Sequence, residues 1–225
     1  MKARHRVRIK ICGITRLADA LCAAEAGVDG LGFIFAARSP RQVAPATARA
    51  IIDQLPPLVA AVGVFVDEEP GRVAAIVREC GINLIQLHGA ESPAYCRELR
   101  ACLAAPCHLL KAVRVGARTT AAETAPYSEA VHGFLLDTYQ QGVVGGTGQT
   151  FDWTLIDRLA LAKPFLLAGG LDADNIGEAL AQVNPYGVDG NSGLEDAPGH
   201  KNHDRIRRFV AAVRAFESNR AAGTR

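Results

Sequence analysis

The sequence lacks the long apolar run, the strong charge and the export signal that mark membrane, nucleic-acid-binding and secreted proteins. Its longest uncharged apolar run, Leu58 to Val66, has nine residues and is too short to cross a bilayer. The formal net charge is only +2, so no overall field attracts nucleic acid. Arg16 and Asp19 interrupt the apolar stretch after the basic N-terminus, which argues against a signal peptide. We therefore expect a cytoplasmic protein with neither a membrane nor a nucleic-acid partner.

Cysteine pairs with metal-binding or redox spacing are also missing. None of the six cysteines lies in a Cys-x-x-Cys pair, and no histidine stands at zinc-finger spacing from such a pair. Without an export signal the thiols are expected to stay reduced, and most of them suit small positions in a core. Cys12 is the exception, because it ends a predicted strand at a place where chemistry can occur.

Short apolar runs alternate with helical segments along all 225 residues. The runs are apolar almost throughout, as parallel strands buried on both faces are. They are Val7–Cys12, Gly30–Phe35, Val59–Val66, Leu84–Leu87, His108–Val113, Gly133–Asp137, Phe165–Ala168 and Gly187–Asp189. The helical segments are Leu17–Ala26, Ala46–Gln54, Gly71–Cys80, Pro93–Leu103, Thr120–Ser128, Trp153–Ala162, Asp174–Gln182 and His203–Ser218. Thr15 and Ser92 are plausible N-caps of the first and fourth helices, and Asp172 or Asp174 of the seventh.

This alternation, without a linker or a break in composition, predicts one α/β domain. We expect a (βα)8 TIM barrel with a parallel eight-stranded core over residues 1–218, and a frayed C-terminal tail over 219–225. A doubly wound sheet fits less well. Its first strand is usually followed by Gly-x-Gly-x-x-Gly, whereas here the chain continues Cys12-Gly13-Ile14-Thr15.

Five polar residues stand at or after the carboxyl ends of predicted strands. They are Cys12, Arg41, His88, Asp137 and Asp189. In a (βα)8 barrel the carboxyl ends of all strands meet at one mouth, where the active site lies. Any one of these residues can simply satisfy loop backbone, but five together predict a catalytic cluster.

Glycine-rich segments follow the last three strands. Loops after strands seven and eight commonly bind phosphate in such barrels, because glycine lets backbone N–H groups approach an anion. Single clusters can be mere tight turns, but clusters after both strands predict a phosphorylated substrate. The predicted phosphate-binding residues are Gly146, Gly169, Gly170, Asn191, Ser192 and Gly193.

Eight motifs, in order and with matching spacing, resemble the phosphoribosylanthranilate isomerase family of tryptophan biosynthesis. They are Lys10–Thr15, Gly32–Phe35 with Ser39–Arg41, Val62–Val66, Gln86–Gly89, Leu135–Asp137, Gly145–Gly148 with Phe151–Trp153, Ala168–Leu171 and Asn191–Glu195. The resemblance runs from about residue 8 to residue 210. It implies a (βα)8 barrel that converts N-(5′-phosphoribosyl)anthranilate to 1-(2-carboxyphenylamino)-1-deoxyribulose 5-phosphate by an Amadori rearrangement, without a metal or organic cofactor.

The resemblance also assigns roles. Cys12 matches the general base and Asp137 the general acid, Arg41 matches the residue that binds the anthranilate carboxylate, and His88 and Asp189 match positions that line the pocket. These roles suit the chemistry, because a carboxylic acid with a raised pKa can protonate the ribose ring oxygen and a thiolate can remove the C2′ hydrogen. An arginine fork can bind both carboxylate oxygens.

Two alternatives remain from the sequence. The histidine-pathway isomerase performs the same rearrangement but has an aspartate at the end of strand one, where this chain has Cys12. A barrel that binds a phosphorylated ligand without turnover would not need both Cys12 and Asp137. No feature demands an oligomer, so we expect a monomer by default, with a homodimer possible.

Overall fold

The barrel is built from parallel strands whose first and last members pair. The computed structural model describes residues 6–138 and 154–222. The barrel strands in these residues are β1 (Arg8–Ile11), β2 (Gly30–Ile34), β3 (Ala60–Phe65), β4 (Leu84–Leu87), β5 (His108–Arg114), β6 (Gly133–Asp137), β7 (Phe165–Ala168) and β8 (Gly187–Gly190). Each strand pairs with the next, and β1 closes the barrel on β8 with Lys10 opposite Asp189. The predicted eight-stranded (βα)8 barrel is confirmed.

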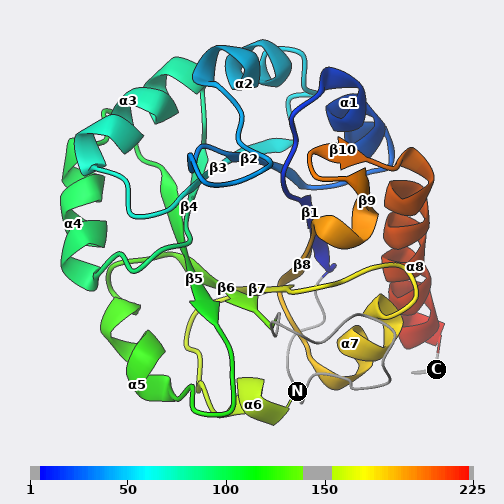
Figure 1. Cartoon of the computed structure of the whole chain (residues 1–225). Helices are drawn as coiled ribbons and strands as arrows, with labels where there is room; N and C mark the ends of the chain where they lie inside the picture. Colours follow the sequence, from blue (N-terminus) through cyan, green and yellow to red (C-terminus); the bar gives the residue numbers. More distant parts are fainter. Residues whose placement is uncertain (1–5, 139–153, 223–225) are drawn as a thin grey trace.

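Helices connect the strands and form a ring around them (Figure 1). They are α1 (Leu17–Glu25), α2 (Pro45–Ile52), α3 (Pro70–Cys80), α4 (Pro93–Cys102), α5 (Ala121–Thr124), α6 (Thr154–Asp157), α7 (Ile176–Gln182) and α8 (His203–Ala222). The fifth predicted helix is a short α5 continued by the 3-10 turn η1 (Ala125–Tyr127), and α6 ends five residues before its predicted end at Ala162. No helix in the described part of the chain is long and apolar enough to span a membrane.

Two apolar layers follow from the alternation of side chains along each strand. On β6, Phe134 and Leu136 belong to the large cluster between strands and helices, whereas Leu135 belongs to a small separate cluster with residues of β5 and β7. A second small cluster contains Cys12, Ile34 and Val64. The small clusters therefore lie inside the barrel, and the side chains of the catalytic candidates share this inner face.

Local signals at helix ends agree with the structure in part. The backbone N–H of Tyr95 donates to the Ser92 hydroxyl at 3.2 Å, so Ser92 caps α4 as predicted. Thr15 is not the cap of α1, because Arg16 holds that position and the Thr15 hydroxyl donates to the Gly199 carbonyl instead. Asn175 is the N-cap residue of α7, and the Asp172 carboxylate accepts from the two N–H groups just before that helix.

The segment after β8 differs most from the prediction. It contains a 3-10 turn η2 (Ser192–Leu194) and a two-stranded antiparallel hairpin of β9 (Glu195–Ala197) and β10 (His200–Lys201). Helix α8 then continues to Ala222, so the tail expected to fray from residue 219 is helical over most of its length. The hairpin matters for the site because it carries Glu195 and Lys201 to the barrel mouth.

Candidate active site

Cys12 follows β1 directly and lies almost completely buried at the mouth. Its backbone N–H donates to the Gly190 carbonyl at 2.8 Å, which fixes it beside the end of β8. Lys10, two residues earlier, points to the same face because side chains alternate along a strand. The Lys10 ammonium donates to both carboxylate oxygens of Asp189, each at 2.8 Å. Cys12, Lys10 and Asp189 therefore form one buried group at the seam between the first and last strands.

Gly32 on β2 leaves the space that this group needs. A Cβ atom at Gly32 would lie 2.8 Å from Cys12 Sγ and 3.1 Å from Lys10 Nζ. The sulfur and the ammonium thus face the same small volume, and glycine is the residue that keeps it open.

Burial and two lysines act in opposite directions on the Cys12 thiol. Burial raises the pKa of Cys12 above its ordinary value, while the positive charges of Lys10 and Lys201 oppose that rise. For Lys10 itself, burial would lower the pKa, but Asp189 and Cys12 outweigh it and the pKa is raised. Lys10 is therefore a cation at neutral pH, and it is positioned next to a sulfur that loses its proton only with difficulty.

Arg41 lies in the loop after β2 and is held by Glu195 of β9. Its Nε and Nη2 donate to the carboxylate at 2.7–3.0 Å. The predicted role of Arg41 as a carboxylate anchor therefore needs a correction in geometry, because the side edge of its fork is already occupied. Nη1 and the second hydrogen of Nη2 form the end edge, which remains available for a second carboxylate. The Arg41 side chain is 19% exposed, which leaves this edge accessible.

Lys201 of β10 ties Glu195 to Asn191. Its ammonium donates to Glu195 Oε1 at 2.8 Å, to Asn191 Oδ1 at 3.0 Å and to the Asn191 carbonyl at 3.1 Å. Burial would raise the pKa of Glu195, but Arg41 and Lys201 outweigh burial and hold it below its usual value. The Asn191 amide oxygen is thus engaged with Lys201, which fixes the side chain at the start of the loop after β8.

Asp137 ends β6 on the other side of the mouth and is half-buried. His88, directly after β4, has its Nε2 3.6 Å from Asp137 Oδ2. The other ring nitrogen, Nδ1, lies 2.9 Å from the amide nitrogen of the buried Gln86. A neutral His88 that accepts this bond on Nδ1 carries its hydrogen on Nε2, the nitrogen that faces Asp137.

The two halves of the mouth are linked electrostatically. Burial raises the pKa of Asp189, while Lys10 and, more weakly, His88 act against that rise. His88 thus acts on Asp189 of the Cys12 group and also faces Asp137. All five predicted strand-end residues are brought to the same end of the barrel.

The loops after β7 and β8 pack against each other. Gly169 and Gly170 have φ of +104° and +65°, a backbone region that favours glycine. A Cβ at Gly193 would lie 2.6 Å from the Leu171 carbonyl oxygen, so the loop after β8 touches the loop after β7. Within residues 6–138 and 154–222, no atom beyond the chain neighbours lies within 4 Å of a Cβ built at Gly170. Gly146, the remaining predicted phosphate residue, lies outside the described residues.

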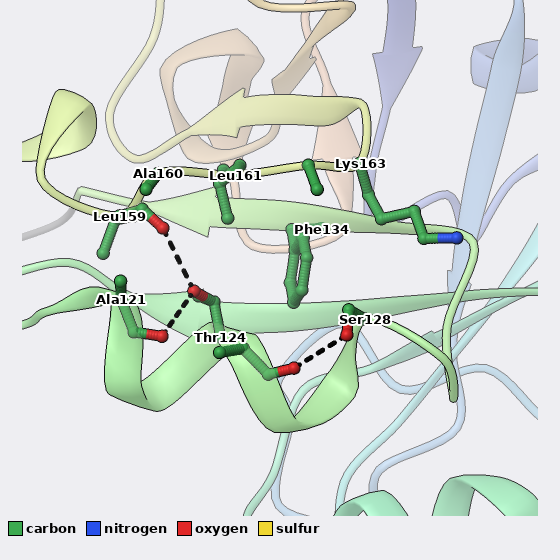
Figure 2. A pocket seen from close by; sticks show the side chains of 10 residues that line it. Ala121, Thr124, Ser128, Phe134, Leu159, Ala160, Leu161 and Lys163 are labelled. Carbon is green, nitrogen blue, oxygen red and sulfur yellow. Dashed lines mark hydrogen bonds between the residues drawn. The ribbon is translucent and has the colours of Figure 1, made fainter.

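A cavity of about 210 Å³ lies away from this mouth, beside α5 (Figure 2). Ala121 and Thr124 of α5, Phe134 of β6 and the segment 159–163 line it. Figure 2 shows Thr124 bonded across it to the Leu159 carbonyl and Lys163 at one end. No catalytic candidate borders this cavity, so it has no part in the site.

Three residues at the mouth escaped the sequence reasoning, namely Lys10, Glu195 and Lys201. Lys10 looked like part of a basic lead-in to the first strand, although a charged residue within a strand buried on both faces is itself a signal. Glu195 and Lys201 belong to the unpredicted hairpin. Within residues 6–138 and 154–222, no group of three His, Cys, Asp or Glu side chains is arranged to hold a metal ion.

Comparisons with known proteins identify the family and agree with the barrel fold. The model of the N-(5′-phosphoribosyl)anthranilate (PRA) isomerase family matches residues 9–212. An N-(5′-phosphoribosyl)anthranilate isomerase of Geobacter sp. (strain M21) is 46% identical over 92% of this chain and 98% of its own length. The crystal structure of phosphoribosyl anthranilate isomerase from Thermotoga maritima is 39% identical, with a TM-score of 0.80 over 93% of this chain and 99% of that one.

A further solved structure of similar fold holds a ligand. It is a phosphoribosyl anthranilate isomerase in complex with reduced 1-(o-carboxyphenylamino)-1-deoxyribulose 5-phosphate. It is 37% identical, with a TM-score of 0.77 over 93% of this chain and 99% of that chain. The ligand in that structure carries a carboxylate and a phosphate at its two ends.

Proposed function

Since the chain belongs to the N-(5′-phosphoribosyl)anthranilate isomerase family, we propose that it converts N-(5′-phosphoribosyl)anthranilate to 1-(2-carboxyphenylamino)-1-deoxyribulose 5-phosphate with Cys12 as general base and Asp137 as general acid. The chain is an isomerase of tryptophan biosynthesis. The observation that carries the assignment of residues is the placement of one thiol and one carboxyl group at the same barrel mouth, between an arginine and a pair of glycine-rich loops.

The two ends of the substrate suit the two ends of this mouth. The end edge of the Arg41 guanidinium is suited to the anthranilate carboxylate, and Glu195 holds the guanidinium plane in place. Backbone N–H groups around Gly169–Gly170 and Ser192–Gly193 are suited to the phosphate, because no side chain intervenes. A substrate fixed at both ends holds its ribose between the loops and the arginine.

The chemistry at the ribose needs one proton donor and one proton acceptor. Protonated Asp137 delivers a proton to the ring oxygen as the ring opens to a Schiff base. The Schiff base acidifies the C2′ hydrogen, and the Cys12 thiolate removes that hydrogen as a proton to give an enolamine. In the tautomerisation C1′ receives the proton held by the Cys12 thiol, and the C2′ enol hydroxyl gives up its proton as the ketone forms, which returns Asp137 to its protonated form. The rearrangement is internal to the substrate, so it needs no external oxidant or reductant.

His88 and Asp189 assist these two groups in the proposal. His88 Nε2 faces Asp137 at 3.6 Å, close enough to influence the charge on the acid but longer than a hydrogen bond. Asp189 acts on the base side through Lys10. The phosphate, carboxylate and proton-transfer roles together use every predicted site residue in the described part of the chain.

The test is turnover by the purified protein. Loss of phosphoribosylanthranilate fluorescence on adding the enzyme would support the activity, and the phosphoribosyl substrate of the histidine-pathway isomerase serves as the specificity control. No turnover of the first substrate would contradict the proposal. Turnover of both would show that the cysteine at the end of β1 does not separate the two reactions. Binding of the substrate without turnover would favour a ligand-binding barrel. The monomeric state remains a prediction that size-exclusion chromatography can check.

A further inference from the structure

We propose that Lys10, held in place by Asp189, is the positioning residue that stabilises the thiolate form of Cys12. The inference rests on the proposed role of Cys12 as the base. It adds a residue to that mechanism, because Lys10 does not touch the substrate and acts only through the sulfur.

The hydrogen bonds of Lys10 leave one direction open. An ammonium group has three N–H donors, and two of them go to the two oxygens of Asp189 at 2.8 Å. Cys12 is the other side chain with which the Lys10 ammonium interacts. The third N–H is directed to the volume at Gly32, which Nζ and Cys12 Sγ border at 3.1 Å and 2.8 Å from the ideal Cβ position. A thiolate is the acceptor that this N–H meets.

The Lys10 ammonium therefore faces the Cys12 sulfur, and Asp189 holds the ammonium in that position. Both oxygens of Asp189 hold Nζ, and β1 and β8 pair with these two residues opposite each other. A lysine side chain ordinarily loses considerable rotational entropy when it is held in one position. Here the barrel seam has already restricted it, so stabilising the thiolate requires no further ordering.

The groups facing Cys12 come from three elements. Lys10 lies on its own strand, Asp189 on β8 and Lys201 on β10. Burial lowers the pKa of Lys201, and its three donors are engaged by Glu195 and by the side chain and carbonyl of Asn191. Asp189 disfavours the thiolate, whereas Lys10, which pairs with Asp189, favours it. Lys10 thus has one N–H group that its carboxylate partner does not engage and that the Cys12 sulfur can accept.

The role of Lys10 in the proton transfer is simple. The Cys12 thiolate accepts the C2′ proton and becomes a thiol, and that proton then passes back to the substrate at C1′. Lys10 stays an ammonium throughout and exchanges no proton with the substrate. Its effect is to increase the fraction of Cys12 that is thiolate at neutral pH, where burial alone would suppress it.

The experiment is a titration of the Cys12 thiol without substrate. The ultraviolet absorbance of thiolate is measured against pH for each protein and for the same protein carrying Cys12→Ser, so that the difference reports Cys12 alone. Wild type is compared with Lys10→Gln, which removes the charge but keeps a donor for Asp189. Lys111→Gln is the matched control, because Lys111 is likewise a buried lysine on a barrel strand that pairs with a carboxylate.

We expect Lys10→Gln to move the Cys12 titration to higher pH by about one unit, equivalent to about tenfold less thiolate at neutral pH. Lys111→Gln should leave the titration unchanged. If Lys10→Gln does not fold, Lys10→Met provides the same loss of charge and the same expectation. An unshifted titration in a folded Lys10 variant, or an equal shift in Lys111→Gln, overturns the inference.

A second readout connects the titration to turnover. The kcat of Lys10→Gln should recover toward wild type as the pH is raised, since the thiolate then forms without help. A uniform loss of kcat at every pH would indicate a merely structural role and would overturn the inference. Because the titration uses no substrate, its failure would leave the isomerase assignment standing, and absence of turnover in wild type would leave the titration interpretable.

Discussion

Two barrel strands, β1 and β5, each carry a buried lysine that pairs with a carboxylate, and the two pairs differ in how many acceptors surround the lysine. Lys111 on β5 donates to Glu91 at 3.0 Å, and the carbonyls of Gly89, Leu87 and Ala112 also lie within 2.7–3.4 Å of its ammonium. Lys10 on β1 donates to the two oxygens of Asp189, with its remaining donor directed to the Cys12 sulfur. The first lysine is saturated with acceptors and the second is not.

The carboxylates differ in the same way. Glu91 also accepts from the backbone N–H groups of Asp67 and Gly89, both at 2.9 Å. The Lys111 pair therefore fixes the loop after β4, which begins with His88. Asp189 lies at the barrel seam, and in the described part of the chain its two oxygens accept hydrogen bonds from Lys10. A saturated pair holds backbone in place, whereas a pair with one donor left over can act on a neighbouring group.

The largest expected effect is on stability, from Lys111→Met. This change leaves Glu91 buried without its cation and removes the ammonium from three backbone carbonyls, so we expect a loss of about 3–5 kcal/mol in the free energy of unfolding. Urea denaturation measures it. Lys10→Met is the matched variant, and its loss should be smaller because only Asp189 loses its partner. If Lys10→Met were the more destabilising of the two, the distinction between the pairs would fail.

Cys12→Ser tests the group toward which the open donor points. A hydroxyl has a much higher pKa than a thiol, so little anionic base remains, and kcat should fall at least ~100-fold. Substrate binding and the free energy of unfolding should change little, since the shape is kept. Cys102→Ser is the control, because Cys102 is exposed at the end of α4. Nearly normal turnover in Cys12→Ser would remove Cys12 from the mechanism.

The pH dependence of kcat/KM in Asp137→Asn reports the titration of Cys12, whose pKa burial raises. If Cys12 titrates at higher pH than the acid, wild-type kcat/KM is flat between the two pKa values, because gain of thiolate is offset by loss of the protonated acid. Without an ionising group at 137, kcat/KM should fall about 100-fold at neutral pH and then rise about tenfold per pH unit up to the Cys12 pKa.

The pH profile of the Asp137→Asn variant is the measurement that decides this point. The alkaline fall seen in wild type should be absent, since that fall reports the loss of the acid proton. Two limbs that persist unchanged would show that Asp137 is not a titrating catalytic group. The acid would then have to be sought at His88 or Asp189.

Arg41→Ala should have the smallest effect. Glu195 keeps Lys201 as its partner, so the fold should survive, and only the end edge of the guanidinium is lost to the substrate. Loss of a charge-assisted pair corresponds to about a tenfold or larger rise in KM, with kcat changed less. Arg49→Ala is the control, because Arg49 pairs with Asp53 on the surface of α2. An unchanged KM would show that the carboxylate binds elsewhere.

The strands were predictable from the sequence because burial on both faces leaves a continuous apolar run. Leu84–Leu87, Gly133–Asp137 and Phe165–Ala168 have the same bounds in the structure as in the prediction. The hairpin of Glu195–Ala197 and His200–Lys201 was not predictable in this way. Its short strands are polar, and they are stabilised by contacts with distant residues such as Arg41 and Asp19.

The ion pairs within the candidate site were harder to predict from the sequence than the residues that lie there. The rule that strand ends meet at one mouth located Cys12, His88 and Asp137 without reference to any contact. It says nothing about which charges neutralise one another. The Lys10–Asp189 pair depends on the register between β1 and β8, and the Arg41–Glu195 pair depends on the hairpin. Both are properties of the closed barrel, not of any local segment.

The seam between β1 and β8 also has a consequence for the order of assembly during synthesis. Lys10 and Asp189 are 179 residues apart in the chain. A ribosome adds about 5–20 residues per second, so β8 emerges roughly 9–36 s after β1. Until then Cys12 and Lys10 lie on a strand whose partner edge does not exist. Lys10 and Cys12 are therefore the first residues of the candidate site to be made and among the last to acquire their surroundings, which are complete only when the final strand closes the ring.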